Sequence, residues 1–158
     1  ESIFNIILHT KKFNIDIANS NVLDLFSGVG SFGLECLSRG SSFVTFVENY
    51  KEVLPILIKN ISNLNYNHNS LVIEKNILKS LDFKIFSKKF DIIFMDPPYK
   101  EKDVSPLLEK INISNLLNEG GIIIIHRHRK EKEDLPNKFK IIEKKTYGIS
   151  KIIFGNFS

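Results

Sequence analysis

The sequence predicts an α/β protein whose central sheet is mostly parallel and is covered by helices on both faces. Short apolar segments alternate along the chain with segments of helical periodicity, and this alternation is typical of strand–helix–strand units. The apolar segments are continuous runs rather than alternating ones, which is expected of strands that are buried on both faces. At 158 residues, the chain is long enough for one domain of this class.

The first half of the chain holds the most regular alternation. In order, we expect a helix over 1–8, a strand over 22–26, a helix over 31–38, a strand over 43–47, a helix within 51–64 and a strand over 71–74. Pro55 lies inside the third helix, so that helix begins late or is kinked, because proline lacks the amide donor that a helix interior requires. The side chains of this helix that we expect to face the core are Leu54, Leu57, Ile58 and Ile61.

The second half is expected to end in an antiparallel pair of strands. In order, we expect a short helix near 78–83, a strand over 90–95, a helix from Ser105 to about Lys110, a strand over 121–125 and two strands over 139–147 and 151–157. Ser105 and Pro106 are expected to cap and open their helix, since proline is favoured in the first helical turn. Gly148 separates the last two strands, which predicts a terminal hairpin.

Composition and charge exclude several classes of protein. Hydrophobic residues make up 42% of the chain and charged residues 25%, which excludes a disordered, collagen-like or coiled-coil chain. No apolar run is longer than the one over 122–125. A membrane-spanning helix needs about 20 apolar residues, so we expect no membrane association. Cys36 is the only cysteine and no secretory signal opens the chain, so we expect a cytoplasmic monomer. The net charge of +4 permits a polyanionic partner without requiring one.

A glycine-rich loop follows the first predicted strand. The segment 28–33 satisfies G-x-G-x-x-G between a strand and a helix, where glycines permit a tight turn and helix N-terminal amides face a ligand. Glu48 lies 20 residues after Gly28, at the end of the second strand, where a carboxylate can accept both ribose hydroxyls of a nucleoside. The alternative is that Gly28, Gly30 and Gly33 only form a tight turn beside a solvated acid. We favour nucleoside binding because strand, loop, helix and acid follow in the required order.

Asp24 narrows the choice of nucleoside. It lies inside the first strand, four residues before the first glycine of the loop. An acid at this position repels a pyrophosphate but attracts a ligand that carries an ammonium and a sulfonium, and S-adenosylmethionine is such a ligand. The alternative is that Asp24 is a buried acid satisfied by nearby backbone amides.

The tetrapeptide Asp96-Pro97-Pro98-Tyr99 directly follows the fourth predicted strand. Its prolines rigidify the backbone and remove two amide donors, so the Pro97 carbonyl and the Asp96 carboxylate can both face one acceptor-only cleft. The exocyclic amine of a base fits such a cleft, because two fixed acceptors bias it toward a tetrahedral, nucleophilic geometry. Tyr99 offers a flat surface on which a flipped base stacks. The alternative is a proline turn that only ends the strand. It does not explain why the tetrapeptide lies beside the glycine loop, where open α/β sheets bind ligands.

These motifs resemble those of the bacterial 16S rRNA guanine-N2 methyltransferases, which use S-adenosylmethionine. The matching segments, in the family's order, are 1–5, 23–35, 38–40, 46–48, 59–60, 91–99 and the hairpin at 147–148. The resemblance implies a Rossmann-like class I methyltransferase fold, with a seven-stranded sheet in the order 3-2-1-4-5-7-6 and strand seven antiparallel. It also implies methyl transfer from S-adenosylmethionine to the exocyclic N2 amine of a guanine in 16S rRNA, with S-adenosylhomocysteine as the product.

The resemblance further implies roles for individual residues. Glu48 would hold the ribose, the glycine loop would pass the methionine end, and Asn76 would contact the adenine edge. The residues implied to bind the cofactor are Asp24, Phe26, Gly28, Gly30, Gly33, Glu48 and Asn76. Those implied to hold the target guanine amine are Asp96, Pro97, Pro98 and Tyr99. No metal is implied, and the implied partner is ribosomal RNA or a small-subunit ribosomal particle.

Two features depart from the family's pattern. Family members carry a basic N-terminal segment before the position of Glu1, so we expect residues 1–158 to form a single methyltransferase domain that lacks this segment and binds RNA weakly. The fifth strand ends in His126 rather than in an acidic residue, and we expect His126 to be a solvated strand end. Cations that follow the fourth and fifth strands are candidates for phosphate contacts, namely Lys100, Lys102, Arg127, Arg129 and Lys130.

Two other functions remain open at this point. The tetrapeptide at 96–99 suits the amine of adenine as well as that of guanine, so an adenine-N6 methyltransferase acting on DNA or RNA is the first alternative. A non-catalytic nucleotide-binding module that takes NAD is the second, although Asp24 and the tetrapeptide argue against it.

Overall fold

The computed structural model describes residues 2–79, 82–100, 103–132 and 134–157. The strands are β1 (Asn21–Leu25), β2 (Phe43–Glu48), β3 (Ser70–Glu74), β4 (Phe90–Met95), β5 (Leu117–His128), β6 (Phe139–Tyr147) and β7 (Ser150–Phe157). They form one seven-stranded sheet in the order β3-β2-β1-β4-β5-β7-β6, in which only β7 and its neighbours pair antiparallel. The fold class and the strand order expected from the sequence are therefore confirmed.

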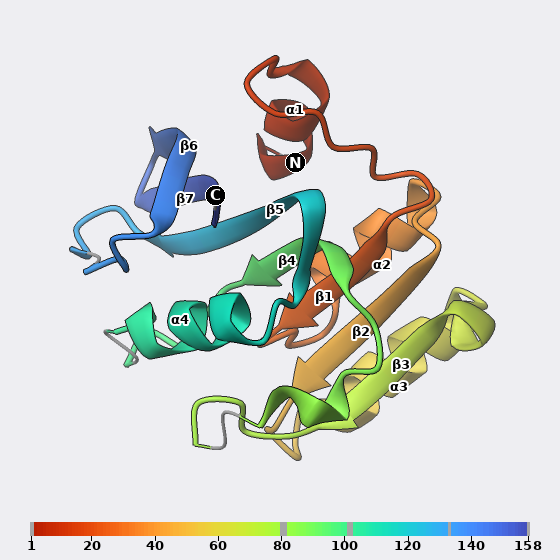
Figure 1. The fold of residues 1–158 in the computed structure, drawn as a ribbon. Helices are drawn as coiled ribbons and strands as arrows, with labels where there is room; N and C mark the ends of the chain where they lie inside the picture. The colour runs from red at the N-terminus through yellow and green to blue at the C-terminus, as the bar shows by residue number, and fades with distance from the viewer. Residues whose placement is uncertain (1, 80–81, 101–102, 133, 158) are drawn as a thin grey trace.

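Helices cover both faces of this sheet (Figure 1). They are α1 (Ser2–His9), α2 (Ser31–Ser38), α3 (Leu54–Asn63) and α4 (Ser105–Ile113), with short 3₁₀ turns at Asn67–Asn69 and Phe83–Ile85. The helices α1, α2 and α3 share one apolar core with alternate residues of the central strands, whereas α4 packs into a second core on the opposite face. Side chains alternate along a strand, so Leu23 and Leu25 of β1 face α4 while Val22 faces the other helices.

The helix α3 begins at Leu54, with Pro55 in its first turn, which confirms the late start that the proline predicts. The prediction that Ile58 faces the core is wrong, because its side chain is 52% exposed; Leu54, Leu57 and Ile61 are buried as expected. The reason lies in the position of α3, which contacts β3 at the edge of the sheet. An edge strand covers only a narrow stripe of a helix, and Ile58 lies beside that stripe.

Most boundaries shift by a few residues from the sequence expectation, and three elements differ more clearly. The helix expected near 78–83 is replaced by the 3₁₀ turn at Phe83–Ile85, although residues 80–81 lie outside the described residues. Ser105 is the first residue of α4 rather than its cap, and the Asp103 carboxylate accepts its backbone amide at 2.9 Å. The strand β5 begins at Leu117, opposite Phe90 of β4, rather than at Gly121. It continues to His128 because β7 pairs antiparallel with its last residues.

The parallel strands place their carboxyl ends along one edge of the sheet, where open α/β folds bind ligands. The loops at this edge follow β1, β2, β3 and β4, and they contain the glycine loop and the tetrapeptide. In the part of the chain that the structure describes, no helix is long and apolar enough to span a bilayer.

Candidate functional site

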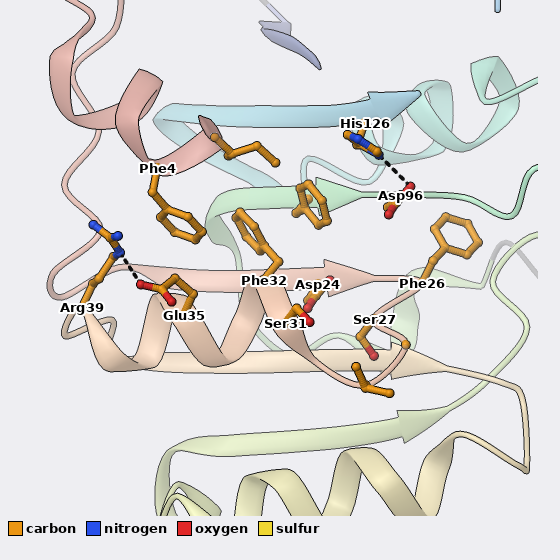
Figure 2. Close-up of a pocket in the computed structure, with 14 residues that line it drawn as sticks. Phe4, Asp24, Phe26, Ser27, Ser31, Phe32, Glu35, Arg39, Asp96 and His126 are labelled. Carbon is orange, nitrogen blue, oxygen red and sulfur yellow. Dashed lines mark hydrogen bonds and ion pairs between the residues drawn. The ribbon is translucent and has the colours of Figure 1, made fainter. Parts of the chain in front are cut away.

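Three cavities open at the carboxyl ends of the strands, and Asp96 lines all of them. The largest, of about 630 Å³, lies between the glycine loop and α1 (Figure 2). The second, of about 290 Å³, lies beside Glu48 and Asn76. The third, of about 180 Å³, lies between the tetrapeptide and the end of β5. The Asp96 carboxylate therefore stands where the three spaces meet.

A column of aromatic rings forms one wall of the largest cavity. The ring of Phe32 on α2 stacks on Phe94 of β4 with a centroid separation of 4.0 Å and on Phe4 of α1 at 5.2 Å. The Arg39 guanidinium lies 4.7 Å from the Phe4 ring centroid and pairs with Glu35 at 2.8 Å (Figure 2). This column attaches α1 to the sheet beside the cavity through stacking and a cation–π contact.

The loop after β1 turns sharply at the cavity mouth. Phe26, Gly28 and Gly30 adopt positive φ angles of 57°, 57° and 95°. A positive φ is uncommon for a residue other than glycine, so the conformation of Phe26 carries a cost in backbone strain. Phe26 and Gly28 both line the first and second cavities, and a Cβ atom on Gly28 would meet nothing within 4 Å. These two residues of the expected cofactor set therefore border open space.

Gly30 and Gly33 lie at the start of α2, on the buried side of the loop. A Cβ atom on Gly30 would lie 2.7 Å from Leu57 Cδ1, and one on Gly33 would lie 2.8 Å from Phe46 Cζ. Neither glycine is among the residues that line the three cavities. Their lack of a side chain is therefore required by the packing of α2 and α3 on the loop and on β2.

Asp24 is buried at the floor of the largest cavity. Its Oδ2 accepts the Gly33 amide at 3.1 Å, whereas among the described residues its Oδ1 has no hydrogen-bond partner. Burial raises the pKa of Asp24 to about 8; the Gly33 amide opposes this rise, and the carboxylates of Asp96 and Glu48 add to it. A buried acid that lines a cavity and has one oxygen without a partner among the described residues can be compensated by a ligand donor or cation in that cavity. Backbone amides therefore satisfy only one of its two oxygens.

The Glu48 carboxylate accepts more hydrogen bonds from the protein itself than the sequence indicates. Its Oε1 accepts the Gly28 amide at 2.7 Å, and its Oε2 accepts the amides of Asn49 and Tyr50 at 2.9 Å each. A carboxylate has about four lone-pair sites, so three backbone bonds leave room for about one more donor. Glu48 thus fixes the glycine loop against the end of β2. By this count its carboxylate can accept a hydrogen bond from about one ribose hydroxyl rather than from both.

Asn76 lines the second cavity together with Glu48, Tyr50 and Ile77. Its Oδ1 accepts the amides of Leu78 and Lys79 at 3.2 and 3.3 Å, which caps the turn after β3. The side-chain oxygen is thereby committed to the protein, and its Nδ2 amide remains as the donor to be offered to a ligand. This cavity therefore combines apolar side chains with a few polar groups, as small-molecule sites do.

The residues of the tetrapeptide after β4 line different cavities. Pro97 is buried and lines the third cavity with Tyr99, while Pro98 lines the second. Tyr99 is 73% exposed, so its ring presents a broad surface at the mouth of the site. The side chain of Asp96 is half exposed.

His126 is the residue of the site that sequence analysis missed. Its Nδ1 lies 3.1 Å from Asp96 Oδ1 (Figure 2), and its Nε2 lies 3.1 Å from Ser150 Oγ. The expectation of a solvated strand end is therefore wrong. A signal for this contact existed: β4 and β5 are neighbours with Met95 opposite Ile125, so the residues that follow these two must lie side by side.

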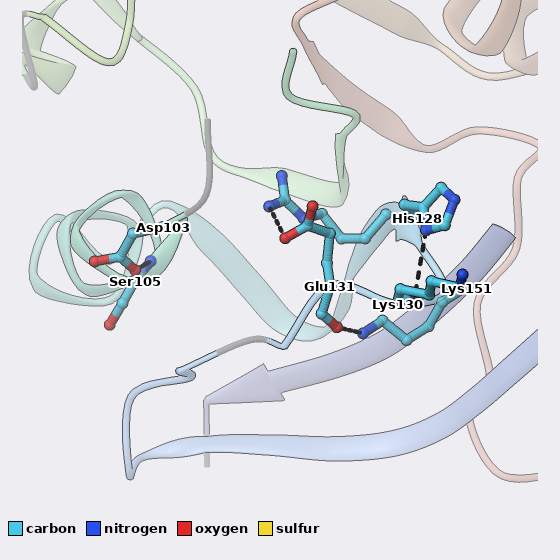
Figure 3. A network of polar contacts seen from close by, with 7 residues as sticks. Asp103, Ser105, His128, Lys130, Glu131 and Lys151 are labelled. Atoms are coloured by element: carbon cyan, nitrogen blue, oxygen red, sulfur yellow. Dashed lines mark hydrogen bonds and ion pairs between the residues drawn. The ribbon is translucent and has the colours of Figure 1, made fainter. Parts of the chain in front are cut away.

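The cations at the carboxyl end of β5 and after it do not form one uniform surface. Arg127 is buried, and its Nη2 lies 4.0 Å from Glu131 Oε2, so its expected role as a phosphate contact is corrected to an internal one. Lys151 Nζ donates to the Glu131 carbonyl (Figure 3). Beyond this network lies a cavity of about 450 Å³, whose cationic lining residues are Arg129, Lys130, Lys132, Lys144 and Lys151.

The two other expected phosphate contacts lie after β4. Lys100 is exposed, and Lys102 lies outside the described residues. Among the described residues there is also no group of three histidine, cysteine or acidic side chains placed to hold a metal ion.

Known proteins resemble this chain over most of its length. The family model described as Conserved hypothetical protein 95 matches residues 1–156. Ribosomal RNA small subunit methyltransferase D of Buchnera aphidicola is 34% identical over 129 residues, which cover 82% of this chain and 66% of that protein. The chain thus spans slightly less than two thirds of that relative.

Solved structures share the fold. A conserved hypothetical protein of Streptococcus pyogenes is 28% identical and superposes with a TM-score of 0.82, over 98% of this chain and 93% of that one. A more distant chain, described as a methyltransferase complexed with S-adenosylhomocysteine, is 16% identical with a TM-score of 0.74, over 97% of this chain and 48% of that one. The sheet and its helices are therefore those of a methyltransferase fold.

Proposed function

The chain belongs to the family described as Conserved hypothetical protein 95, and from this premise we propose that it is an S-adenosylmethionine-dependent ribosomal RNA methyltransferase. We assign the methyl acceptor as the exocyclic N2 amine of a guanine in 16S rRNA, the substrate being free RNA or a small-subunit particle in the cytoplasm. The name of the Buchnera relative supports the class of substrate. The arrangement of the site supports the amine.

One observation carries the proposal: the carboxylates of Asp24 and Asp96 border the same cavity. Asp24 is buried, and one of its oxygens has no hydrogen-bond partner among the residues that the structure describes, which suits the ammonium of a cationic cofactor. Asp96 is half exposed at the mouth, which suits a substrate donor that arrives from solvent. A site with a cation-binding floor and an acceptor at its entrance fits transfer from S-adenosylmethionine to an amine.

The cofactor would be held by residues from three strand ends. Asp24 would accept its ammonium group, Glu48 one ribose hydroxyl, and Asn76 would donate to the adenine edge. Gly28 would let the backbone approach the ligand closely, since its side-chain direction is open. When bound, S-adenosylmethionine supplies a methyl group on a positively charged sulfur, an electrophile that needs no metal to activate it.

Asp96 and Pro97 would prepare the amine. The lone pair of an exocyclic amine is delocalised into its base, and two fixed acceptors draw its N–H bonds out of the ring plane. The charge that develops on the nitrogen during attack is stabilised by the Asp96 carboxylate. Tyr99 would stack on the base; such stacking is worth about 1–3 kcal/mol per base.

Affinity for S-adenosylmethionine is expected to rise with pH. The pKa of Asp24 is raised to about 8 in the ligand-free chain, so its carboxyl is largely protonated at neutral pH, whereas an ammonium requires the carboxylate. Binding therefore releases a proton, and each pH unit below 8 weakens affinity by up to about tenfold. Titration calorimetry at about pH 6 and about pH 8 measures this linkage.

The control for this prediction is Asp24→Asn, which should bind the cofactor more weakly and with a flat pH profile. A parent chain whose affinity does not change over this range would contradict the ammonium assignment. NAD in the same titration tests the nucleotide-binding alternative: equal affinity for NAD and S-adenosylmethionine would favour that module over the methyltransferase.

RNA affinity is expected to depend on the basic cavity behind β5. Lys144 is exposed and lines that cavity, so Lys144→Glu should weaken binding of small-subunit RNA and lower the slope of log K against log salt by about one. Lys89→Glu is the matched control, since Lys89 is also exposed but precedes β4, at the opposite ends of the strands. Filter binding over a salt series measures both slopes. Equal effects of the two variants would place the RNA elsewhere.

The acceptor itself is identified by mass mapping of methylated nucleosides. Small-subunit RNA and particles from cells that lack the full-length protein are incubated with it and labelled cofactor. N2-methylguanine in 16S rRNA is the expected product. Methylated adenine, or transfer to DNA, would favour the adenine-N6 alternative.

A further inference from the structure

His126 joins two elements that the proposed mechanism treats separately. It is the residue of β5 that follows the last β4–β5 pair, Met95 with Ile125, and it lies beside Asp96. On its other side it reaches Ser150, the first residue of β7. The side chain of His126 is 31% exposed, and it lines both the largest and the third cavity. His126 therefore borders both spaces that meet at the tetrapeptide.

The chemistry of Asp96 fixes the direction of one hydrogen bond, and for a neutral imidazole this sets the direction of the other. An ionised Asp96 carboxylate can only accept, so the Nδ1 of His126 must donate to Oδ1. In the neutral imidazole Nε2 is then the acceptor, and the Ser150 hydroxyl donates to it. Ser150 is held in place because β7 pairs with β5, with Ser150 opposite His128. The resulting chain runs from Ser150 through His126 to Asp96.

We propose that His126 is a positioning residue for methyl transfer, which orients the Asp96 carboxylate toward the substrate amine. Asp96 is half exposed, and His126 is the partner that ties its Oδ1 to the sheet. With Oδ1 engaged, Oδ2 is presented to the amine in one orientation. This inference rests on the proposed function, because it gives Asp96 the role of acceptor for the amine.

The test compares two amides at position 126. Asparagine places its side-chain N–H close to the position of histidine Nδ1, whereas glutamine places it near Nε2. His126→Asn should therefore keep kcat within about threefold of the parent, whereas His126→Gln and His126→Leu should lower it by about 10- to 100-fold, the scale of a misplaced catalytic group. The KM for S-adenosylmethionine should stay unchanged in all three variants. His68→Leu, a histidine exposed in the turn before β3, is the control.

A double-mutant cycle tests whether His126 acts through Asp96. In an Asp96→Asn background, His126→Leu should cause no further loss of kcat, because the carboxylate that it orients is gone. Equal activity of the Asn, Gln and Leu variants at position 126, or additive losses in the cycle, would overturn the inference. Full activity of Asp96→Asn alone would instead contradict the proposed function, so the two failures are distinguishable.

Discussion

Asp96→Asn is expected to lower the rate of methyl transfer by about 10²–10³-fold, the scale found when one preorganised electrostatic contact is removed from a transition state. The amide keeps the size of the carboxylate but replaces a charged acceptor with one neutral oxygen and a donor. The charge that develops on the attacking nitrogen is then no longer offset. Because Asp96 stands at the entrance and Asp24 at the floor, the cofactor should still bind with nearly parental affinity.

Single-turnover transfer from labelled S-adenosylmethionine measures the chemical step, and calorimetry measures cofactor affinity on the same sample. The control is Asp16→Asn, an exposed acid that accepts a local backbone amide before β1. Near-parental turnover of Asp96→Asn would show that the acceptor pair is not what prepares the amine. A large loss of cofactor affinity would move Asp96 from the substrate to the cofactor.

Gly33→Ala is expected to destabilise the fold by about 1–3 kcal/mol or more, the cost of overpacking a close-packed core. The new Cβ atom would lie 2.8 Å from Phe46 Cζ and also 2.8 Å from Val44 Cγ1. Both side chains are buried on β2, so neither can move away without disturbing the sheet. The variant also displaces the amide that Asp24 accepts.

Gly28→Ala is the matched variant in the same loop, because its Cβ atom would meet nothing within 4 Å. Its positive φ of 57° should cost only about 1–2 kcal/mol, while the methyl group enters the space proposed for the cofactor. Urea denaturation should rank Gly33→Ala as the less stable variant, and calorimetry should rank Gly28→Ala as the weaker binder among folded samples. A Gly33→Ala chain as stable as the parent would contradict the packing argument.

The sequence carried the fold because its signals were local and agreed with one another. Each central strand is a short apolar run, and Gly148 lies in the turn that connects the paired strands β6 and β7. What it could not carry depends on contacts between distant segments. The carboxyl end of β5 is extended by its antiparallel partner β7, and its early start at Leu117 pairs with β4. The exposure of Ile58 depends on how far the sheet extends beneath α3.

The site shows the same division. Asp24, Glu48 and Asp96 were predicted from their places after or within strands, and all three border the cavities. The hydrogen bonds of Glu48 to three backbone amides were not predictable, because they depend on how the two loops meet. His126 was misjudged because a histidine at a strand end has no meaning until the partner strand and its register are known.

The burial of Asp24 also sets a cost in conformational stability. Its pKa is about 8 in the folded chain against an ordinary value of 3.8, so between these two pH values the native state holds a proton that the unfolded state has released. The contribution of Asp24 to the free energy of unfolding therefore falls as pH rises through this interval and levels off above pH 8. A ligand cation on Asp24 would reverse this loss, since it replaces the proton as the neutralising charge. The alkaline conditions expected to favour the proposed cofactor are thus those in which the ligand-free domain loses this contribution, and binding of that cofactor would restore it.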